Sequence, residues 1–144
     1  MGTNEVSQRR ANPPLVEFSN TMVALHREHF GRGPAAARAF IADGFAICVL
    51  TDVYTKVEQT LIEAGRLDHV RDTRLLHQES LEEEYKSAAE AVLGRQVLAF
   101  ISATHSEPDV EVEVYLLGDP IDSAGSDGAR DGESSAAGAG ALAD

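Results

Sequence analysis

The apolar positions between residues 13 and 30 recur at the spacing of an α-helix. The predicted buried stripe is Leu15, Phe18, Met22, Leu25 and His29. Asn12 and Pro13 come just before it, where an N-cap residue and a first-turn proline are favoured, and Gly31 follows as a typical helix stop. The pattern predicts a first helix with one buried face.

Two short apolar segments, residues 39–42 and 45–50, come next and flank the pair Asp43-Gly44. An Asp-Gly pair between apolar runs is a strong signal for a two-residue β-hairpin turn. Nearly every position in both segments is apolar. We therefore expect this hairpin to be buried on both faces or to meet another subunit.

Two helices are predicted after the hairpin. Thr55 and Glu58 have the spacing of a capping box, which opens a helix running to Gly65. A longer helix follows from about Asp68 to Leu93, with a predicted buried stripe of Val70, Arg74, His77, Leu81, Tyr85, Ala88 and Val92. A guanidinium on such a stripe needs an acidic partner. We expect Glu58 or Glu63 to pair with Arg74.

A second hairpin is predicted from residues 96–104 and 110–117, joined by turn-forming residues between His105 and Asp109. The first strand is apolar on both faces. The second alternates, with Val110, Val112 and Val114 in one phase and glutamates in the other. We expect the glutamate side to face water.

These elements predict an α+β fold, a two-layer sandwich in which about three helices cover one face of a four-stranded, mainly antiparallel sheet. The expected order is helix, hairpin, two helices, hairpin (α-ββ-αα-ββ). We place a single domain at residues 13–118, after a flexible N-terminus at residues 1–12. Residues 119–144 contain 16 Gly, Ala and Ser and six acidic residues, which is typical of a disordered acidic tail.

The composition argues against several classes of protein. The chain of 144 residues has 24 acidic and 12 basic residues, and a net charge of −12 argues against nucleic-acid binding. One cysteine, Cys48, excludes a disulfide framework. No apolar run is long enough to cross a bilayer, and the first residues lack the apolar stretch of a secretory signal. We expect a cytoplasmic protein without direct membrane insertion.

Candidate chemistry is sparse. Arg32, Gly33 and Arg38 follow the first helix, where a glycine and two guanidinium groups are suited to an anion. Arg74 is the buried guanidinium, and His105 and Asp109 flank the last turn as candidates for acid–base work. Each candidate also has a purely structural interpretation. The segment after the first helix can simply end that helix and form a turn, Arg74 can form a structural ion pair, and His105 and Asp109 can be ordinary turn residues.

A metal site is not expected. His26 and His29 are three residues apart on the first helix, but the sequence offers no second close pair of ligands. His29 is interpreted as part of the packing stripe and His26 as lying at its border. We predict no catalytic constellation, no cofactor and no metal, which favours a binding protein over an enzyme.

Several short segments resemble one family. They are His29-Phe30-Gly31-Arg32-Gly33-Pro34, Tyr54-Thr55-Lys56-Val57-Glu58, Glu63-Ala64-Gly65-Arg66, Gly94-Arg95 and His105-Ser106-Glu107-Pro108-Asp109-Val110. Together they are similar to the C component of a Na+-translocating membrane-potential-generating system (MpsC-like), formerly a domain of unknown function, over roughly residues 15–118. The resemblance implies association with a membrane ion-translocating system and carries no enzymatic activity with it.

Two hypotheses follow. The first is a binding or regulatory module that self-associates as a homodimer and works with a membrane ion-transport partner protein. It depends on the apolar hairpin and on the lack of a catalytic constellation. The alternative is a small-anion-binding protein or acid–base enzyme that uses Arg32, Arg38, Arg74 and the His105/Asp109 turn. This alternative requires those residues to converge on one pocket.

Overall fold

The computed structural model describes residues 12–121. Its elements are α2 (Pro13–Phe30), β1 (Ala36–Ala42), β2 (Phe45–Thr51), α3 (Lys56–Glu63), α4 (Leu67–Leu93), β3 (Arg95–Ser106) and β4 (Asp109–Pro120). The order α-ββ-αα-ββ confirms the predicted α+β fold. β4 extends through Asp119 and Pro120, two residues into the segment predicted as a tail. The tail from residue 122 onward, and the predicted flexible N-terminus up to residue 11, lie outside the described residues.

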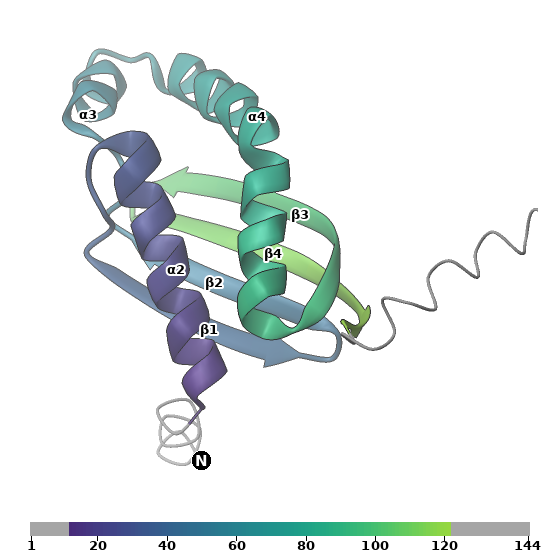
Figure 1. The fold of residues 1–144 in the computed structure, drawn as a ribbon. Helices are drawn as coiled ribbons and strands as arrows, with labels where there is room; N and C mark the ends of the chain where they lie inside the picture. Colours follow the sequence, from purple (N-terminus) through teal and green to yellow (C-terminus); the bar gives the residue numbers. More distant parts are fainter. Residues whose placement is uncertain (1–11, 122–144) are drawn as a thin grey trace, which may run out of the picture.

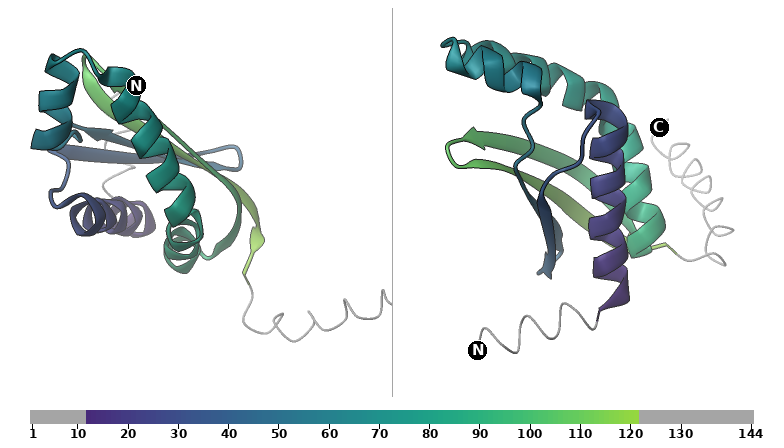
Figure 2. Two further views of the ribbon diagram at one scale, coloured as in Figure 1. Left: turned by 90° about the horizontal axis from the view of Figure 1, so that it is seen from above. Right: turned by 90° about the vertical axis from the view of Figure 1, so that its left-hand side faces the viewer.

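The four strands form one antiparallel sheet in the order β1-β2-β4-β3 (Figure 1). The two predicted hairpins are thus joined by pairing between β2 and β4. α2 packs on β1, and α4 packs on β3 and on α2. The described helices all lie on the same side of the sheet (Figure 2). The molecule therefore has two layers, one helical and one of sheet.

The local signals in the sequence are confirmed at the atomic level. The side chain of Asn12 accepts a hydrogen bond from the backbone N–H of Leu15. Asp43 and Gly44 both have positive φ, as the tight turn of a two-residue hairpin requires. Thr55 and Glu58 form the predicted capping box at the start of α3. Short-range patterns were sufficient here because each feature involves only neighbouring residues.

The hydrophobic core fills the space between the two layers. Phe18 and Met22 on α2 are fully buried, and Phe18 meets the ring of Tyr115 on β4 edge-on, with 5.3 Å between centroids. Ala46 and Cys48 lie on the side of β2 that faces the helices and are buried in the same core. Complete burial of these side chains supplies the main apolar driving force for docking the helices on the sheet.

The structure reverses the predicted orientation of β4. Glu111 and Glu113 face the helices and are 5% and 1% exposed, so the expectation that they face water was wrong. Tyr115 and Leu117 share their phase and are buried with them. The valines of β4 lie on the other side of the sheet, which no described helix covers. The strand takes this phase because polar partners for the two glutamates lie inside the fold.

The two histidines of α2 are also exchanged relative to the prediction. His26 is only 2% exposed, whereas the side chain of His29 is 17% exposed and lies 3.1 Å from a carboxylate oxygen of Glu84. The buried face of the helix is therefore rotated toward His26. As a result an imidazole, and not only apolar groups, faces the sheet.

The first hairpin is not buried on both faces. Ala39 and Ala46 are buried against the helices, but Ile41 and Phe45 are 44% and 40% exposed. Of the two expectations for this hairpin, burial on both faces is wrong. Contact with another subunit stays a prediction.

Candidate functional site: a polar pocket beneath the longest helix

A pocket opens between α4 and the inner side of β3 and β4, with a volume of about 210 Å³. Its walls are largely apolar and include Phe30, Leu81, Tyr85 and Phe100. The polar groups of its lining include His26, Arg74, Glu111 and Glu113. A mainly apolar cleft with a few converging polar groups is the usual form of a small-ligand site.

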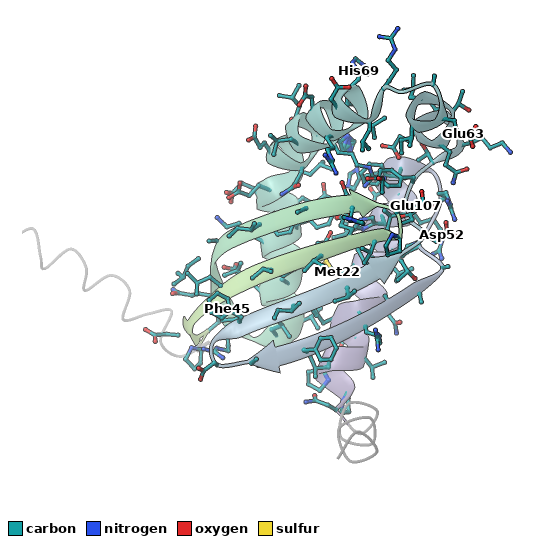
Figure 3. The ribbon with its side chains drawn as sticks, turned by 180° about the vertical axis from the view of Figure 1, so that it is seen from behind. Met22, Phe45, Asp52, Glu63, His69 and Glu107 are labelled. Carbon is teal, nitrogen blue, oxygen red and sulfur yellow. The ribbon has the colours of Figure 1, made fainter. Side chains whose placement is uncertain are left out.

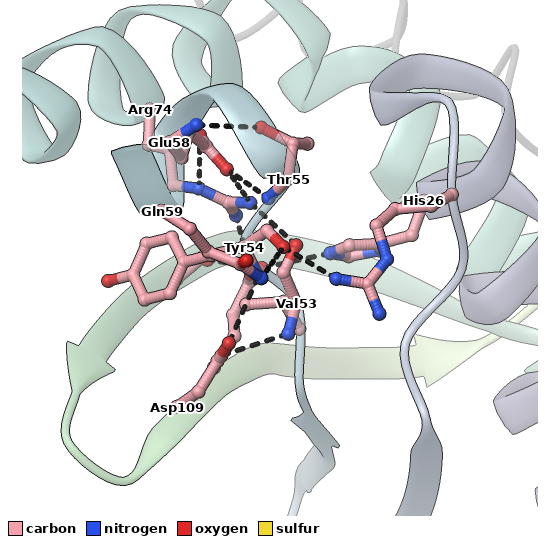
Figure 4. Close-up of polar contacts among 11 residues, drawn as sticks. His26, Val53, Tyr54, Thr55, Glu58, Gln59, Arg74 and Asp109 are labelled. Atoms are coloured by element: carbon pink, nitrogen blue, oxygen red, sulfur yellow. Dashed lines mark hydrogen bonds and ion pairs between the residues drawn. The ribbon is translucent and has the colours of Figure 1, made fainter. Parts of the chain in front are cut away.

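Arg74 on α4 links three elements across this region (Figure 4). Its Nε and Nη2 atoms donate to the carboxylate of Glu58 on α3, each at 2.8 Å. Nη1 donates to Oε1 of Glu111 at 3.0 Å, and Nη2 also donates to the carbonyl of Val53. The predicted pairing of Arg74 with Glu58 is confirmed, and Glu111 is a second acidic partner.

The guanidinium also lies against aromatic rings, 4.4 Å from the ring centroid of Phe30 and 5.0 Å from that of Tyr54. Burial disfavours the charge of Arg74, but the hydrogen bonds and charges of Glu58 and Glu111 outweigh this effect and raise its pKa. Arg74 is thus a permanently charged, fixed group at the site.

Glu111 and Glu113 lie on the same face of β4, two residues apart. The hydroxyl of Ser102 donates to Oε2 of Glu111 at 3.0 Å, and the hydroxyl of Tyr115 donates to Oε1 of Glu113 at 3.0 Å. Both carboxylates are therefore anchored by donors from the sheet. Anchoring fixes the direction in which their remaining oxygen lone pairs point.

His26 completes the cluster from α2. Its Nε2 atom lies 3.3 Å from Oε2 of Glu111 and 3.6 Å from Oε2 of Glu113. Its Nδ1 atom lies 3.2 Å from the carbonyl oxygen of Met22. The ring stacks on Phe30 and meets Tyr85 edge-on, which holds its orientation.

The two carboxyl groups differ in proton affinity. Burial and the adjacent charge of Glu111 raise the pKa of Glu113 well above its ordinary value. Burial also disfavours ionisation of Glu111, but its hydrogen bond with His26 and the charges of His26 and Arg74 lower its pKa overall. When the pair holds one proton, it therefore resides on Glu113, the most deeply buried acid of the cluster.

Three of the predicted site residues meet at Val53 and Tyr54. Arg32 donates to the carbonyl of Tyr54 at 2.6 Å, and Asp109 accepts from both backbone N–H groups of this pair, at 2.9 and 3.2 Å. Arg74 donates to the carbonyl of Val53. These contacts hold the connection between β2 and α3 in place, so much of the hydrogen-bonding capacity of the three side chains is used within the fold.

The other predicted site residues lie elsewhere. Gly33 is in the connection between α2 and β1, where an added Cβ would be 3.2 Å from the guanidinium of Arg27. Arg38 is on β1, opposite Val49. His105 is on β3, where its Nδ1 atom lies 3.0 Å from the carbonyl of Pro108. A common anion or acid–base site for all six residues stays a prediction.

The residues that line the pocket were mostly missed by sequence reasoning. Arg74 is among the predicted site residues, whereas Glu111 and Glu113 are predicted to face solvent. One signal could have found them. Tyr115 and Leu117 share the phase of the glutamates, so burial of those large residues also brings the two carboxyl groups inside.

A second feature lies on the opposite side of the molecule. The register of the strands places one side chain in two on the surface facing away from the helices. We call this the outer sheet face; its residues are Arg38, Phe40, Ala42, Phe45, Ile47, Val49, Thr51, Ala99, Ile101, Ala103, His105, Val110, Val112, Val114 and Leu116. Figure 3 views the molecule from this side, with the helices behind the sheet.

Residues 15–119 match the family model of the Na+-translocating membrane potential-generating system (MpsC). The chain belongs to this MpsC family. Among the described helices and strands, the match leaves out the first two residues of α2 and the last residue of β4, so it includes both the pocket and the outer sheet face. No curated protein and no solved structure matches the chain.

The described helices of this MpsC-family chain differ from membrane-spanning helices. Among the helices at residues 12–121, none combines the length and the apolar character needed to cross a membrane.

Proposed function

We propose that this protein is a binding module of the MpsC family that acts as a homodimer, in which two copies pack through their outer sheet faces. The observation that carries the proposal is the apolar character of that face. Ile101 is 62% exposed and Phe45 is 40% exposed, and the valines of β4 lie between them. A contiguous apolar patch of this kind is typical of a protein interface.

Charge favours a second copy as the occupant. The chain carries a net charge of −12, so two copies repel each other through most of their surfaces. None of the residues of the outer sheet face is acidic. This face is therefore the part of the described surface where two acidic chains approach at the lowest electrostatic cost.

The geometry of a sheet also suits a symmetric pair. Two packed sheets lie about 10 Å apart, with side chains from both faces interdigitating between them. Four strands paired over the seven-residue lengths of β1 and β2 offer an area of roughly 400 Å² in projection, within the size range of the largest apolar patch on a typical monomer. A two-fold axis through its centre would bury the same patch on both copies.

The test is the molar mass of the full chain in solution, measured by size-exclusion chromatography with light scattering. We expect twice the chain mass for the wild-type protein and a monomer for Ile101→Glu, because a buried carboxylate on each copy would face the other. Leu76→Glu is the matched control. Leu76 is 66% exposed on α4, on the helical side, and its replacement should leave the dimer intact.

A wild-type monomer at every concentration would contradict the proposal. A dimer that survives Ile101→Glu but is lost in Leu76→Glu would move the interface to the helical layer and also contradict it. Both residues are largely exposed, so neither variant should prevent folding.

We further infer from the family description that the dimer works with a membrane ion-transport protein. The measurement is affinity capture with the full chain as bait on detergent-solubilised membranes. A stoichiometric ion transporter should be captured by the wild-type protein. Recovery of the bait alone would contradict the inference.

A further inference from the structure

We propose that His26, Glu111 and Glu113 bind a divalent transition-metal ion at the inner end of the pocket. One potential ligand atom from each residue lies within 4.8 Å of the other two. The three side chains come from α2 and β4 and are all buried. A metal at the centre of such a triangle can contact all three atoms after small side-chain adjustments.

The tautomer of His26 supports a metal ligand. Its Nδ1 atom faces the carbonyl oxygen of Met22, which can only accept a hydrogen bond, so Nδ1 carries the proton. In the neutral ring the Nε2 lone pair then faces the two carboxylates. Metal-bound histidines are commonly held by this kind of bond from the second ring nitrogen to a backbone carbonyl.

The outer contacts of the two carboxylates have the same form. Arg74 binds Oε1 of Glu111 and Tyr115 binds Oε1 of Glu113, and the Oε2 atom of each faces His26. Oε2 of Glu111 also accepts from Ser102, which leaves one of its two lone pairs for a metal. Fixed outer contacts of this kind orient metal ligands and lower the cost of bringing them together. All three proposed ligands are thus oriented by groups outside the cluster.

The charges in this region match a divalent cation. Arg74 is bound through two nitrogens to Glu58, so the positive charge of Arg74 and the negative charge of Glu58 cancel. Glu111 and Glu113 then contribute two negative charges when both are ionised. Two ionised carboxylates this close together would repel each other in a dry interior unless a cation or a proton lies between them.

The donor set also selects the class of metal. Imidazole nitrogen is preferred by Zn²⁺, Co²⁺ and similar ions, whereas Mg²⁺ prefers oxygen ligands in octahedral geometry. Three protein ligands leave at least one position for water or a ligand atom. That position would face the pocket, because all three residues line it. The pocket also provides an entry path for the ion.

The structure offers a control cluster as well. Glu28, His29 and Glu84 also place their ligand atoms within 4.8 Å of one another, but both glutamates are exposed and the cluster does not line the pocket. A metal bound there would be a surface association. Variants at the two clusters therefore separate the proposed site from adventitious binding.

The experiment uses the full chain, stripped of metal with a chelator and titrated with Co²⁺ and, separately, with Zn²⁺. Calorimetry should show one equivalent bound, and Co²⁺ should develop visible absorption bands characteristic of protein nitrogen and oxygen ligands. A tenfold excess of Mg²⁺ should leave both signals unchanged. Glu113→Gln keeps an oxygen to accept from Tyr115 and should weaken binding by at least about 100-fold, more than the loss of an outer contact.

His29→Gln is the control and should bind as the wild-type protein does. Absence of binding to the wild-type chain overturns the proposal. So does binding that persists in Glu113→Gln and disappears in His29→Gln, which assigns the ion to the exposed cluster. Thermal unfolding of each stripped variant confirms that it is folded. The proposed dimer does not depend on this site. If the protein proves to be a monomer, the measurement of metal binding therefore still tests the proposed metal site.

Discussion

At the scale of single residues, the buried polar side chains described between residues 12 and 121 form one set connected by hydrogen bonds and close contacts. Arg74 contacts Glu58 and Glu111, and Glu111 in turn contacts Ser102 and His26. Each ionised group removed from water is costly, and the cost is offset only while its partners stay in place. The energetics of this set are therefore strongly non-additive.

The first prediction concerns Arg74. Arg74→Met should lower the free energy of unfolding by about 3–5 kcal/mol, because it leaves the buried Glu111 and the half-buried Glu58 without their cation. The measurement is urea-induced unfolding followed by circular dichroism. Arg71→Met is the matched control on the exposed side of the same helix and should change stability by less than about 0.5 kcal/mol. Equal effects of the two substitutions would refute the buried network.

The second prediction concerns the response of stability to pH. Burial lowers the pKa of His77 below its ordinary value, with further lowering by His29 and Arg74, while Glu58 opposes the shift. The unfolded chain therefore binds this proton more readily than the folded one. The contribution of His77 to the free energy of unfolding is fully present above pH 6.5, the ordinary pKa of histidine. It is lost as the pH falls through the lower pKa that His77 has in the folded protein.

His77→Phe removes this titration, and its ring can still pack on Phe30, whose centroid lies 4.9 Å from that of His77. The free energy of unfolding of the variant, relative to the wild-type protein, should be larger at pH 5 than at pH 8. His69→Phe is the exposed control on the same helix, and it should change the pH dependence of stability less than His77→Phe does. A difference for His77→Phe that is independent of pH would contradict the prediction.

At the scale of elements, the connection between β2 and α3 determines where Glu58 meets Arg74. The carboxylate of Asp109 accepts hydrogen bonds from the backbone N–H groups of Val53 and Tyr54, and the capping box fixes the first turn of α3. The helix is only eight residues long and has no buried residue of its own, so capping is a large part of its stability.

The third prediction follows from that cap. Thr55→Ala should lower the free energy of unfolding by about 1 kcal/mol, because the N–H of Glu58 loses its acceptor. Thr60→Ala, an exposed substitution in the same helix, is the control and should have a smaller effect. The two are compared by chemical unfolding. A larger effect of Thr60→Ala would show that the cap does not stabilise α3.

Elements also show where prediction from sequence reaches its limit. The helices and both hairpins follow from local spacing and turn chemistry. The phase of β4 does not, because both of its faces carry large residues and the choice depends on distant partners. His26 is 85 residues from Glu111 in the chain, and Arg74 is 37 residues from it. A period-two pattern defines two faces but does not state which one has such partners.

At the scale of the whole molecule, the orientation of β4 determines the character of both the pocket and the outer sheet face. Because the glutamates of β4 face the helices, the pocket has a polar floor. Because the valines therefore face outward, the outer sheet face is apolar. The pairing of β2 with β4 joins the two hairpins into one continuous surface, and no short-range signal in the sequence specifies that strand order.

The measurement that tests the proposed dimer most directly is a distance between spin labels on two copies of the chain. Ala103 is exposed on the outer sheet face opposite Val112, and Ala103→Cys provides the labelling site. Cys48 is buried and its pKa is raised by burial, so it should not react with the label. Thr60→Cys, exposed on α3, is the matched control.

We predict a clearly shorter inter-copy distance for Ala103→Cys than for Thr60→Cys, because Ala103 lies on the face that packs against the other copy and Thr60 lies on α3 in the helical layer. A dipolar signal that is short for Thr60→Cys, or absent from both labelled chains, would contradict packing through the outer sheet face.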